Sequence, residues 1–179
     1  MRIFVIGLMG AGKSTIGRRL SRRTSWPYFD NDALVEQVAG RTAPEIEAEG
    51  GVDALHDTEL AAFERALTIP PPVILGVAGF VVVDPELRLR MREAGTVIWL
   101  RARPETLRMR VGSGRGRRED ATDIEWIRSV VAERTPAFEE AADIVIDVDR
   151  LRPRHVVDEI VQRLGIEPDQ AEAASTSTF

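Results

Sequence analysis

The stretch "GLMGAGKST" at residues 7–15 constrains the fold of this chain more than any other part of its sequence. It matches the pattern G-x-x-x-x-G-K-[ST], follows the apolar run "RIFVI" at 2–6, and leads into "KSTIGRRLSRR" at 13–23. In that last segment Ile16 and Leu20 are spaced as on one face of a helix, and arginines occupy the other face. A strand, a glycine-rich turn and a helix in this order form a cradle for phosphate. The glycines let backbone N–H groups turn inward, and the helix N-terminus adds positive charge.

Lys13 is the only lysine among the 24 lysine and arginine residues of the chain. Arginine is a broad planar fork, whereas lysine is a compact ammonium on a flexible stem that can fold over a narrow loop. We expect Lys13 to bridge the β- and γ-phosphates of a nucleotide, and the Ser14 hydroxyl to ligate Mg²⁺. The alternative is a glycine-rich strand-to-helix turn that holds no ligand.

Beyond this loop, strand-like apolar runs alternate with helix-like segments, which predicts an α/β fold with a parallel sheet covered on both faces. We expect one domain over residues 1–166 and a disordered, small and polar tail over 167–179. Besides 2–6, the expected strands are 27–30, 73–79, 96–100 and 142–148. Besides 13–23, the expected helices are 33–67, interrupted near Gly40 and Gly50-Gly51, then 85–95 and 153–164.

Composition excludes several classes of protein. The chain has 179 residues, 44% of them hydrophobic, which is enough for one sizeable core. Its net charge of −5 argues against binding to nucleic acid or to an anionic membrane through its whole surface. It has no cysteine, hence no disulfide or thiolate metal site, and no apolar run near the roughly 20 residues of a membrane span. We expect a cytoplasmic monomer.

Two aspartates follow the second expected strand, in "FDND" at 29–32. Ligands of such sheets bind at the carboxyl ends of the strands, where Asp30 and Asp32 would lie. One carboxylate can order the water shell of Mg²⁺, while the other accepts a proton from the hydroxyl that receives the phosphate. The alternative is an aspartate that caps the following helix. One cap does not need two aspartates.

The segment "RMRVGSGRGRRED" at 108–120 combines three glycines with five arginines. This composition is too flexible for a packed element and predicts a mobile lid at about 111–121. Closure of the lid would exclude water and bring Arg117 or Arg118 onto the transferring phosphoryl group. An RNA-binding patch is the alternative, but no aromatic residue interrupts the segment and the net charge is negative.

Four sequence blocks together resemble the shikimate kinase family in order and spacing, from residue 2 to about 165. They are "GLMGAGKSTIGRRLS", "FDND", Gly40-Arg41 and "RTP" at 134–136. The resemblance implies the three-layer P-loop kinase fold of the nucleoside monophosphate kinases, with a five-stranded parallel sheet in the order 2-3-1-4-5. It also implies ATP as co-substrate and Mg²⁺ as cofactor.

The resemblance assigns expected roles to individual residues. Asp32 would be the general base, Asp30 a metal ligand through water, Arg117 the lid arginine, Arg134 the grip on an acceptor carboxylate, and Gly79 a backbone contact to the acceptor. The implied nucleotide-binding residues are Gly10, Ala11, Gly12, Lys13, Ser14 and Thr15, with Arg110 and the Arg152-Pro153 turn on either side of the adenine.

Four positions depart from the family pattern, and three of them fall in the expected acceptor site. His56 stands where the family has a second arginine that grips the acceptor carboxylate, and Ala78-Gly79-Phe80 stands in place of a run of three glycines, so Ala78 and Phe80 depart there. Arg118 replaces a proline of the lid. Imidazole is mostly neutral at pH 7, so His56 would hold a carboxylate less well than arginine does. The alternative is local repacking in an unchanged enzyme.

These observations lead to two hypotheses of different classes. The first is an ATP-dependent kinase that phosphorylates a hydroxyl of shikimate or of a related polyol, cyclitol or sugar acid. The second is a nucleotide-binding regulatory protein of the same fold with a degraded acceptor site. Production of ADP with and without an acceptor distinguishes them, and the acceptor itself is not identified by the sequence.

Overall fold

Five parallel strands form a single sheet in the computed structural model, which describes residues 1–111 and 122–166. The order β2-β3-β1-β4-β5 confirms the α/β class and the strand order implied by the resemblance. All four strand pairings are parallel. The strands are β1 (Arg2–Ile6), β2 (Tyr28–Phe29), β3 (Val73–Gly76), β4 (Thr96–Arg101) and β5 (Ile144–Asp147).

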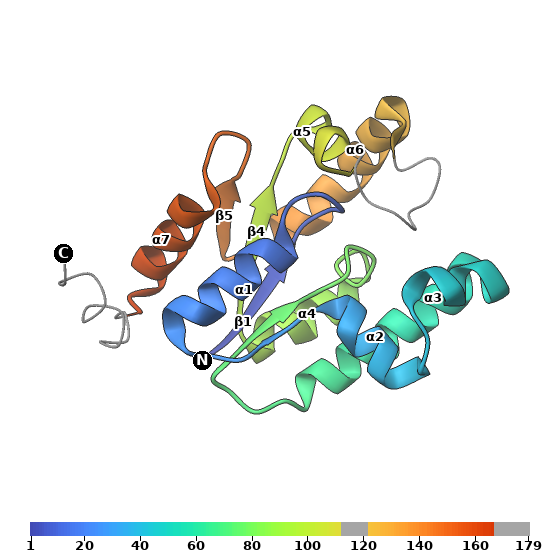
Figure 1. Cartoon of the computed structure of the whole chain (residues 1–179), viewed down its shortest axis with the longest axis horizontal. Coiled ribbons are helices and arrows are strands. Elements are labelled where there is room, and N and C mark those ends of the chain that lie inside the picture. Colours follow the sequence, from blue (N-terminus) through green and yellow to red (C-terminus); the bar gives the residue numbers. More distant parts are fainter. Residues whose placement is uncertain (112–121, 167–179) are drawn as a thin grey trace, which may run out of the picture.

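The central strand β1 is apolar on both faces because helices cover both faces of the sheet. Residues 3–6 are completely buried, and Phe4 pairs with Leu75 of β3 on one side and Val97 of β4 on the other. Figure 1 shows the sheet flanked by helices along its whole width. The helices are α1 (Lys13–Thr24), α2 (Asn31–Ala39), α3 (Ala43–Leu67), α4 (Pro85–Ala94), α5 (Pro104–Val111), α6 (Ile124–Ala141) and α7 (Pro153–Leu164).

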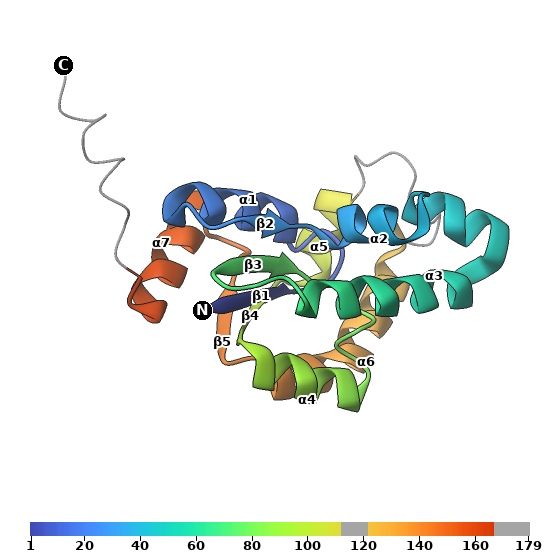
Figure 2. The same cartoon turned by 90° about the horizontal axis from the view of Figure 1, so that it is seen from below.

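The two faces of the sheet bury two separate cores. Figure 2 shows α1 and α7 on one face and α4 and α6 on the other. Alternate residues of β1 point to opposite faces, so Phe4 packs with Trp99 of β4 and Phe138 of α6, whereas Ile3 packs with residues of α1 and α7. The β1–α1 loop therefore follows a central strand that is packed on both faces. Because the strands are parallel, the carboxyl ends of β1, β2 and β3 lie at the same edge of the sheet.

The glycine interruptions expected in the second helical region are confirmed. Helix α2 ends at Gly40, which has a φ of 68°, and α3 bends at Gly51, which has a φ of 76°. Strand β3 ends at Gly76 rather than at residue 79, although Val77 and Ala78 are still buried. The expected strands at 27–30 and 142–148 are likewise longer than β2 and β5.

The expectation that residues 108–120 are too flexible to pack is wrong for residues 108–111, which belong to helix α5. Residues 108–111 form the last turn of α5, and Val111 is buried together with Leu107 one turn before it. These two apolar residues are four apart and share a helix face, which is enough to hold an arginine-rich turn in place. Residues 112–121 and 167–179, which include the expected lid and tail, lie outside the described residues. No helix in the described part of the chain is long and apolar enough to cross a membrane.

Candidate active site

The glycine-rich loop adopts the conformation that its sequence predicts. Gly10 and Gly12 have φ angles of 85° and 103°, in the left-handed region that favours glycine. A Cβ at Gly10 would lie 2.9 Å from the carbonyl oxygen of Leu107, so the loop packs closely against α5. The amide of Ala11 donates to the Leu8 carbonyl at 3.0 Å and closes the turn.

The start of α1 is suited to an anion. Within the described residues no side chain caps this N-terminus, and the first turn of α1 contains no acidic residue. The Lys13 side chain folds back over the loop, where its Nζ donates to the Gly7 carbonyl oxygen at 2.8 Å. Backbone N–H groups and one ammonium thus surround the position that a phosphate would take.

Asp30 and Asp32 lie at the end of β2, as expected, but in different settings. Helix α2 begins at Asn31, so Asp30 occupies the N-cap position and Asp32 is an exposed residue of the first turn. Within the described residues the Asp30 side chain makes no capping hydrogen bond, and its Oδ2 lies 3.8 Å from Nη2 of Arg18. Asp32 is not the cap, so capping does not explain its presence.

The oxygen donors near the loop fit Mg²⁺ better than a metal that needs a complete protein cage. No group of three or more His, Cys, Asp or Glu residues that could hold a metal occurs in residues 1–111 and 122–166. Mg²⁺ takes hard oxygen ligands, keeps several waters, and needs only one or two protein groups beside phosphate oxygens. The Ser14 hydroxyl and the Asp30 carboxylate are groups of this kind, and both lie near the Tyr28 hydroxyl.

Glu59 brings the nucleotide side and the acceptor side of the site together. It is a partly buried residue of α3, and burial followed by the charge of Asp32 raises its pKa to about 7. The charges of Lys13 and Arg134 act in the opposite direction. A lysine of the phosphate loop, an aspartate of α2 and an arginine of α6 therefore all lie within electrostatic reach of one carboxyl group.

The sequence analysis did not single out Glu59. Its only signal was its place three residues after His56, which puts both side chains on one face of α3. Besides Glu47 of α3 itself, the groups that perturb its pKa come from α1, α2 and α6, and this gathering is visible only in the folded chain.

Arg134 and Gly79 lie side by side, as the resemblance implied for residues of one acceptor site. A Cβ at Gly79 would lie 3.5 Å from Nη1 of Arg134. The Nε of Arg134 is buried without a hydrogen-bond partner in the described residues. Buried guanidinium nitrogens normally have an acceptor, and a carboxylate is the acceptor that matches their geometry.

Two of the departures in the expected acceptor site, His56 and Phe80, contact each other. The ring centroids of His56 and Phe80 are 3.5 Å apart with an interplanar angle of 5°, a parallel stack. His56 comes from α3 and Phe80 from the segment after β3, directly after Gly79. These two positions, which we expect to depart from the family pattern, therefore form one local unit.

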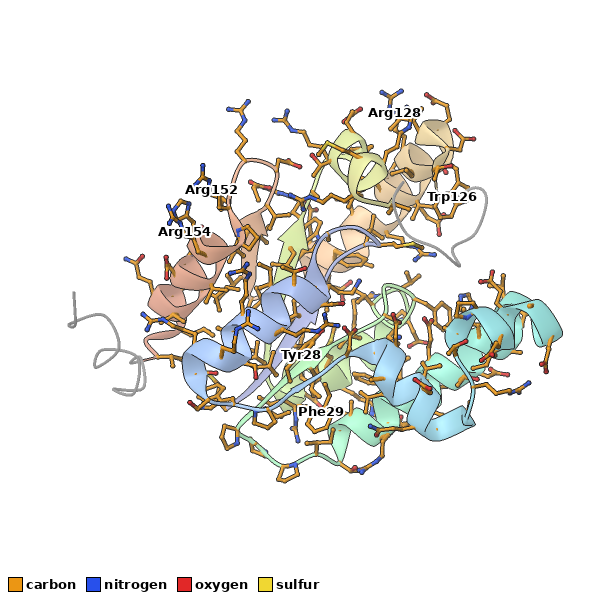
Figure 3. The ribbon with its side chains drawn as sticks, viewed as in Figure 1. Tyr28, Phe29, Trp126, Arg128, Arg152 and Arg154 are labelled. Atoms are coloured by element: carbon orange, nitrogen blue, oxygen red, sulfur yellow. The ribbon has the colours of Figure 1, made fainter. Side chains whose placement is uncertain are left out.

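Two of the residues expected around the adenine, Arg110 and Arg152, lie in the described part of the chain. Arg110 of α5 donates from Nη2 to the Val148 carbonyl at 2.8 Å and from Nη1 to the Ala11 carbonyl at 3.3 Å. It thus spans from the phosphate loop to the end of β5. Arg152 is the N-cap residue of α7 and lies at the beginning of that helix in Figure 3. The sandwich of adenine between Arg110 and the Arg152-Pro153 turn stays a prediction, and Arg117 lies outside the described residues.

A cavity of about 740 Å³ lies next to this site, along the ends of β4 and β5. It reaches Leu8 and Arg134, but most of its charged lining is already paired within the chain. Its ion pairs are Arg101–Asp147, Arg103–Asp149 and Arg163–Glu159. The chemistry expected of the sequence motifs lies at the loop and at Glu59 rather than in this cavity.

The strand order and the lysine-containing phosphate loop define a P-loop kinase fold. The family model described as shikimate kinase matches residues 9–165. A shikimate kinase from Symbiobacterium thermophilum is 38% identical over 168 residues, covering 92% of this chain and 96% of that protein. One from Cupriavidus pinatubonensis is 32% identical over 177 residues, covering 98% and 92%. The chain belongs to the shikimate kinase family, and is therefore a small-molecule kinase.

Solved structures agree with this fold. A shikimate kinase from Acinetobacter baumannii in complex with shikimate aligns with a TM-score of 0.83 at 23% identity, covering 91% of this chain and 92% of that one. A gluconokinase from Sinorhizobium meliloti aligns with a TM-score of 0.60 at 18% identity, covering 92% and 91%. At these identities the likeness concerns the fold alone.

Proposed function

We propose that this chain transfers the γ-phosphoryl group of ATP to a hydroxyl of a small polar acceptor, with shikimate as the first candidate. The observation that carries the proposal is the gathering of Lys13, Asp32 and Arg134 around Glu59. A phosphate-binding ammonium, a proton-accepting carboxylate and a carboxylate-binding guanidinium are the three groups that such a transfer needs. The names of the relatives and the shikimate bound to the Acinetobacter baumannii enzyme support shikimate as the candidate.

Each group has one task in the proposed reaction. The loop amides hold the β-phosphate, and Lys13 moves from the Gly7 carbonyl onto the β- and γ-phosphate oxygens. Asp32 accepts the proton of the acceptor hydroxyl as its oxygen attacks the γ-phosphorus. The bond from that phosphorus to the oxygen bridging the β-phosphate breaks, and ADP leaves. Arg134 holds the acceptor through a carboxylate, which supplies the partner that its buried Nε lacks among the described residues.

Ser14 and Asp30 are the residues that would hold Mg²⁺, Ser14 directly and Asp30 through water. When bound, the metal would neutralise charge on the phosphates. The donor set supports this assignment, because both groups offer hard oxygen and lie near one another beside the loop.

The stacked pair of His56 and Phe80 is the part of the site that determines how well shikimate fits. A stacked imidazole presents an aromatic surface where the family has a charged fork, so we expect shikimate to bind less tightly than an arginine at position 56 would allow. The same surface favours an acceptor with an apolar ring face, such as a related cyclitol.

The test is a coupled assay of ADP formation in Mg²⁺-ATP, with shikimate and then with related polyols, cyclitols and sugar acids. Asp32→Asn keeps the size of the side chain but cannot accept the proton, and we expect it to lower acceptor-dependent ADP formation at least about 100-fold. Glu36→Gln is the matched control, since it removes another exposed carboxylate of α2. Acceptor-independent binding of ADP, with no turnover on any acceptor, would contradict the proposal and favour a regulatory protein.

A further inference from the structure

Tyr28 is the only tyrosine of the chain, and its ring lies in a slot that two glycines leave open. It belongs to β2 and lies beside α1, where it is labelled in Figure 3. A Cβ at Gly17 of α1 would lie 2.2 Å from Cε2 of the ring, and a Cβ at Gly76 of β3 would lie 2.7 Å from the phenolic oxygen. Neither glycine has a positive φ, so the ring of Tyr28 requires glycine at position 17 and its hydroxyl requires glycine at position 76. Glycine destabilises the interior of a helix or strand, so glycine at positions 17 and 76 lowers the stability of α1 and β3.

The phenolic hydroxyl is buried and makes no hydrogen bond of ordinary geometry in the described residues, although Asp30 and Ser14 both lie within its reach. A phenol keeps its proton near neutral pH and can donate it to a hydrogen bond. A phenylalanine would fill the same slot without leaving a polar atom unpaired. The packing of the chain alone therefore explains the ring but not the hydroxyl.

The hydroxyl lies next to both residues that we assign to the metal. A Cβ at Gly76 would lie 2.7 Å from the phenolic oxygen of Tyr28 and 3.5 Å from Oδ1 of Asp30. The two oxygens therefore lie close to the same point. Ser14 is also close enough to influence the phenol. The other carboxylate oxygen of Asp30, Oδ2, faces the exposed Arg18 at 3.8 Å. Tyr28 and Arg18 thus approach different oxygens of one carboxylate.

We propose that Tyr28 is a positioning residue, whose hydroxyl donates a hydrogen bond to Oδ1 of Asp30 when Mg²⁺ and nucleotide are bound. This bond holds the carboxylate toward Ser14, and it gives the buried hydroxyl a hydrogen bond of ordinary geometry. The inference rests on the proposed function, because that function places Ser14 and Asp30 at the metal.

The test is Tyr28→Phe, which removes the hydroxyl and keeps the ring. Binding of ADP is measured by calorimetry at a series of Mg²⁺ concentrations and again in EDTA, together with the melting temperature of the protein alone. We expect the Mg²⁺ concentration that gives half of the maximal enhancement of ADP binding to rise about 5- to 10-fold. ADP affinity in EDTA should remain that of the parent. The melting temperature should be equal to or above the parent's, because an unpaired buried hydroxyl is gone.

Ser21→Ala is the matched control, since it removes a hydroxyl from α1 that is already bonded, with its Oγ donating to the Trp26 carbonyl at 2.6 Å. We expect this variant to melt at a lower temperature with an unchanged Mg²⁺ requirement. The inference is overturned if Tyr28→Phe leaves the Mg²⁺ requirement unchanged, melts below the parent, or weakens ADP binding equally in EDTA. A parent protein that does not bind ADP at all would instead refute the proposed function.

Discussion

Glu59 makes the stability of this protein depend on pH in a direction opposite to that of most carboxylates. Burial, and next Asp32, raise its pKa from 4.5 to about 7. The folded state therefore favours the protonated form, and the stability that this preference contributes is fully present below pH 4.5. That contribution is lost as the pH rises through about 7. Replacement by glutamine removes the effect, because an amide has nearly the same shape and carries no charge at any of these pH values.

The size of the effect follows from the two pKa values. The step from 4.5 to about 7 corresponds to at most about 3 kcal/mol at pH 8. Water around a partly buried carboxyl group screens part of this, which leaves about 1–2 kcal/mol. We therefore expect Glu59→Gln to equal the parent in stability near pH 4.5 and to exceed it by about 1–2 kcal/mol at pH 8. For a chain of this length, that is a rise in melting temperature of about 2–8 °C.

Urea unfolding at several pH values between 4.5 and 8 measures this difference. The control is Glu36→Gln, which removes an exposed carboxylate on α2 and should follow the parent at every pH. Curves of stability against pH that run parallel for the parent and Glu59→Gln would refute the reasoning. That result would also contradict the inference that Asp32, Lys13 and Arg134 lie around this carboxyl group.

Three further predictions concern the ligands. Mg²⁺-ATP at 100 times its dissociation constant should stabilise the protein by about 2.7 kcal/mol. Lys13→Ala should abolish that gain in a melting experiment, and Lys13→Arg should also fail because the fork is too wide for the loop; normal binding by either variant would contradict the role of Lys13. His56→Arg should lower the KM for shikimate about 10-fold by restoring one charge-assisted contact. If the double variant His56→Arg, Phe80→Gly still shows no turnover of shikimate in steady-state kinetics, the site serves another acceptor. Arg134→Ala should strongly impair turnover of acceptors that carry a carboxylate and spare neutral ones, whereas equal loss on both would rule out a carboxylate-binding role.

The central part of the fold could be predicted from the sequence because its signals are local. The phosphate loop lies between an apolar run and an amphipathic segment, and the glycine interruptions of the α2–α3 region mark real turns. Helix α5 could not be predicted in the same way, because the contact that fixes it joins Leu107 to a core built from distant strands. Strand β3 ends at Gly76, and the apolar run that continues to Ala78 gives no local sign of this end.

Candidate residues for the site could be proposed from the sequence one by one, but the contacts between them could not. His56 and Phe80 were each identifiable as departures from a family pattern, yet only the fold shows that one ring lies on the other. Glu59 and Tyr28 gave no comparable signal, because their properties come from residues on other helices and strands. Long-range electrostatics and packing decide both cases, and neither leaves a periodicity in the sequence.

The most direct test of the central claim is the identity of the product. Mass spectrometry of the acceptor after incubation with Mg²⁺-ATP, with ADP measured in the same samples, follows both halves of the transfer. We predict a phosphorylated acceptor formed in equal amount to ADP, and neither product with Lys13→Ala. Release of ADP without a phosphorylated acceptor, across shikimate and the related polyols, cyclitols and sugar acids, would contradict the account.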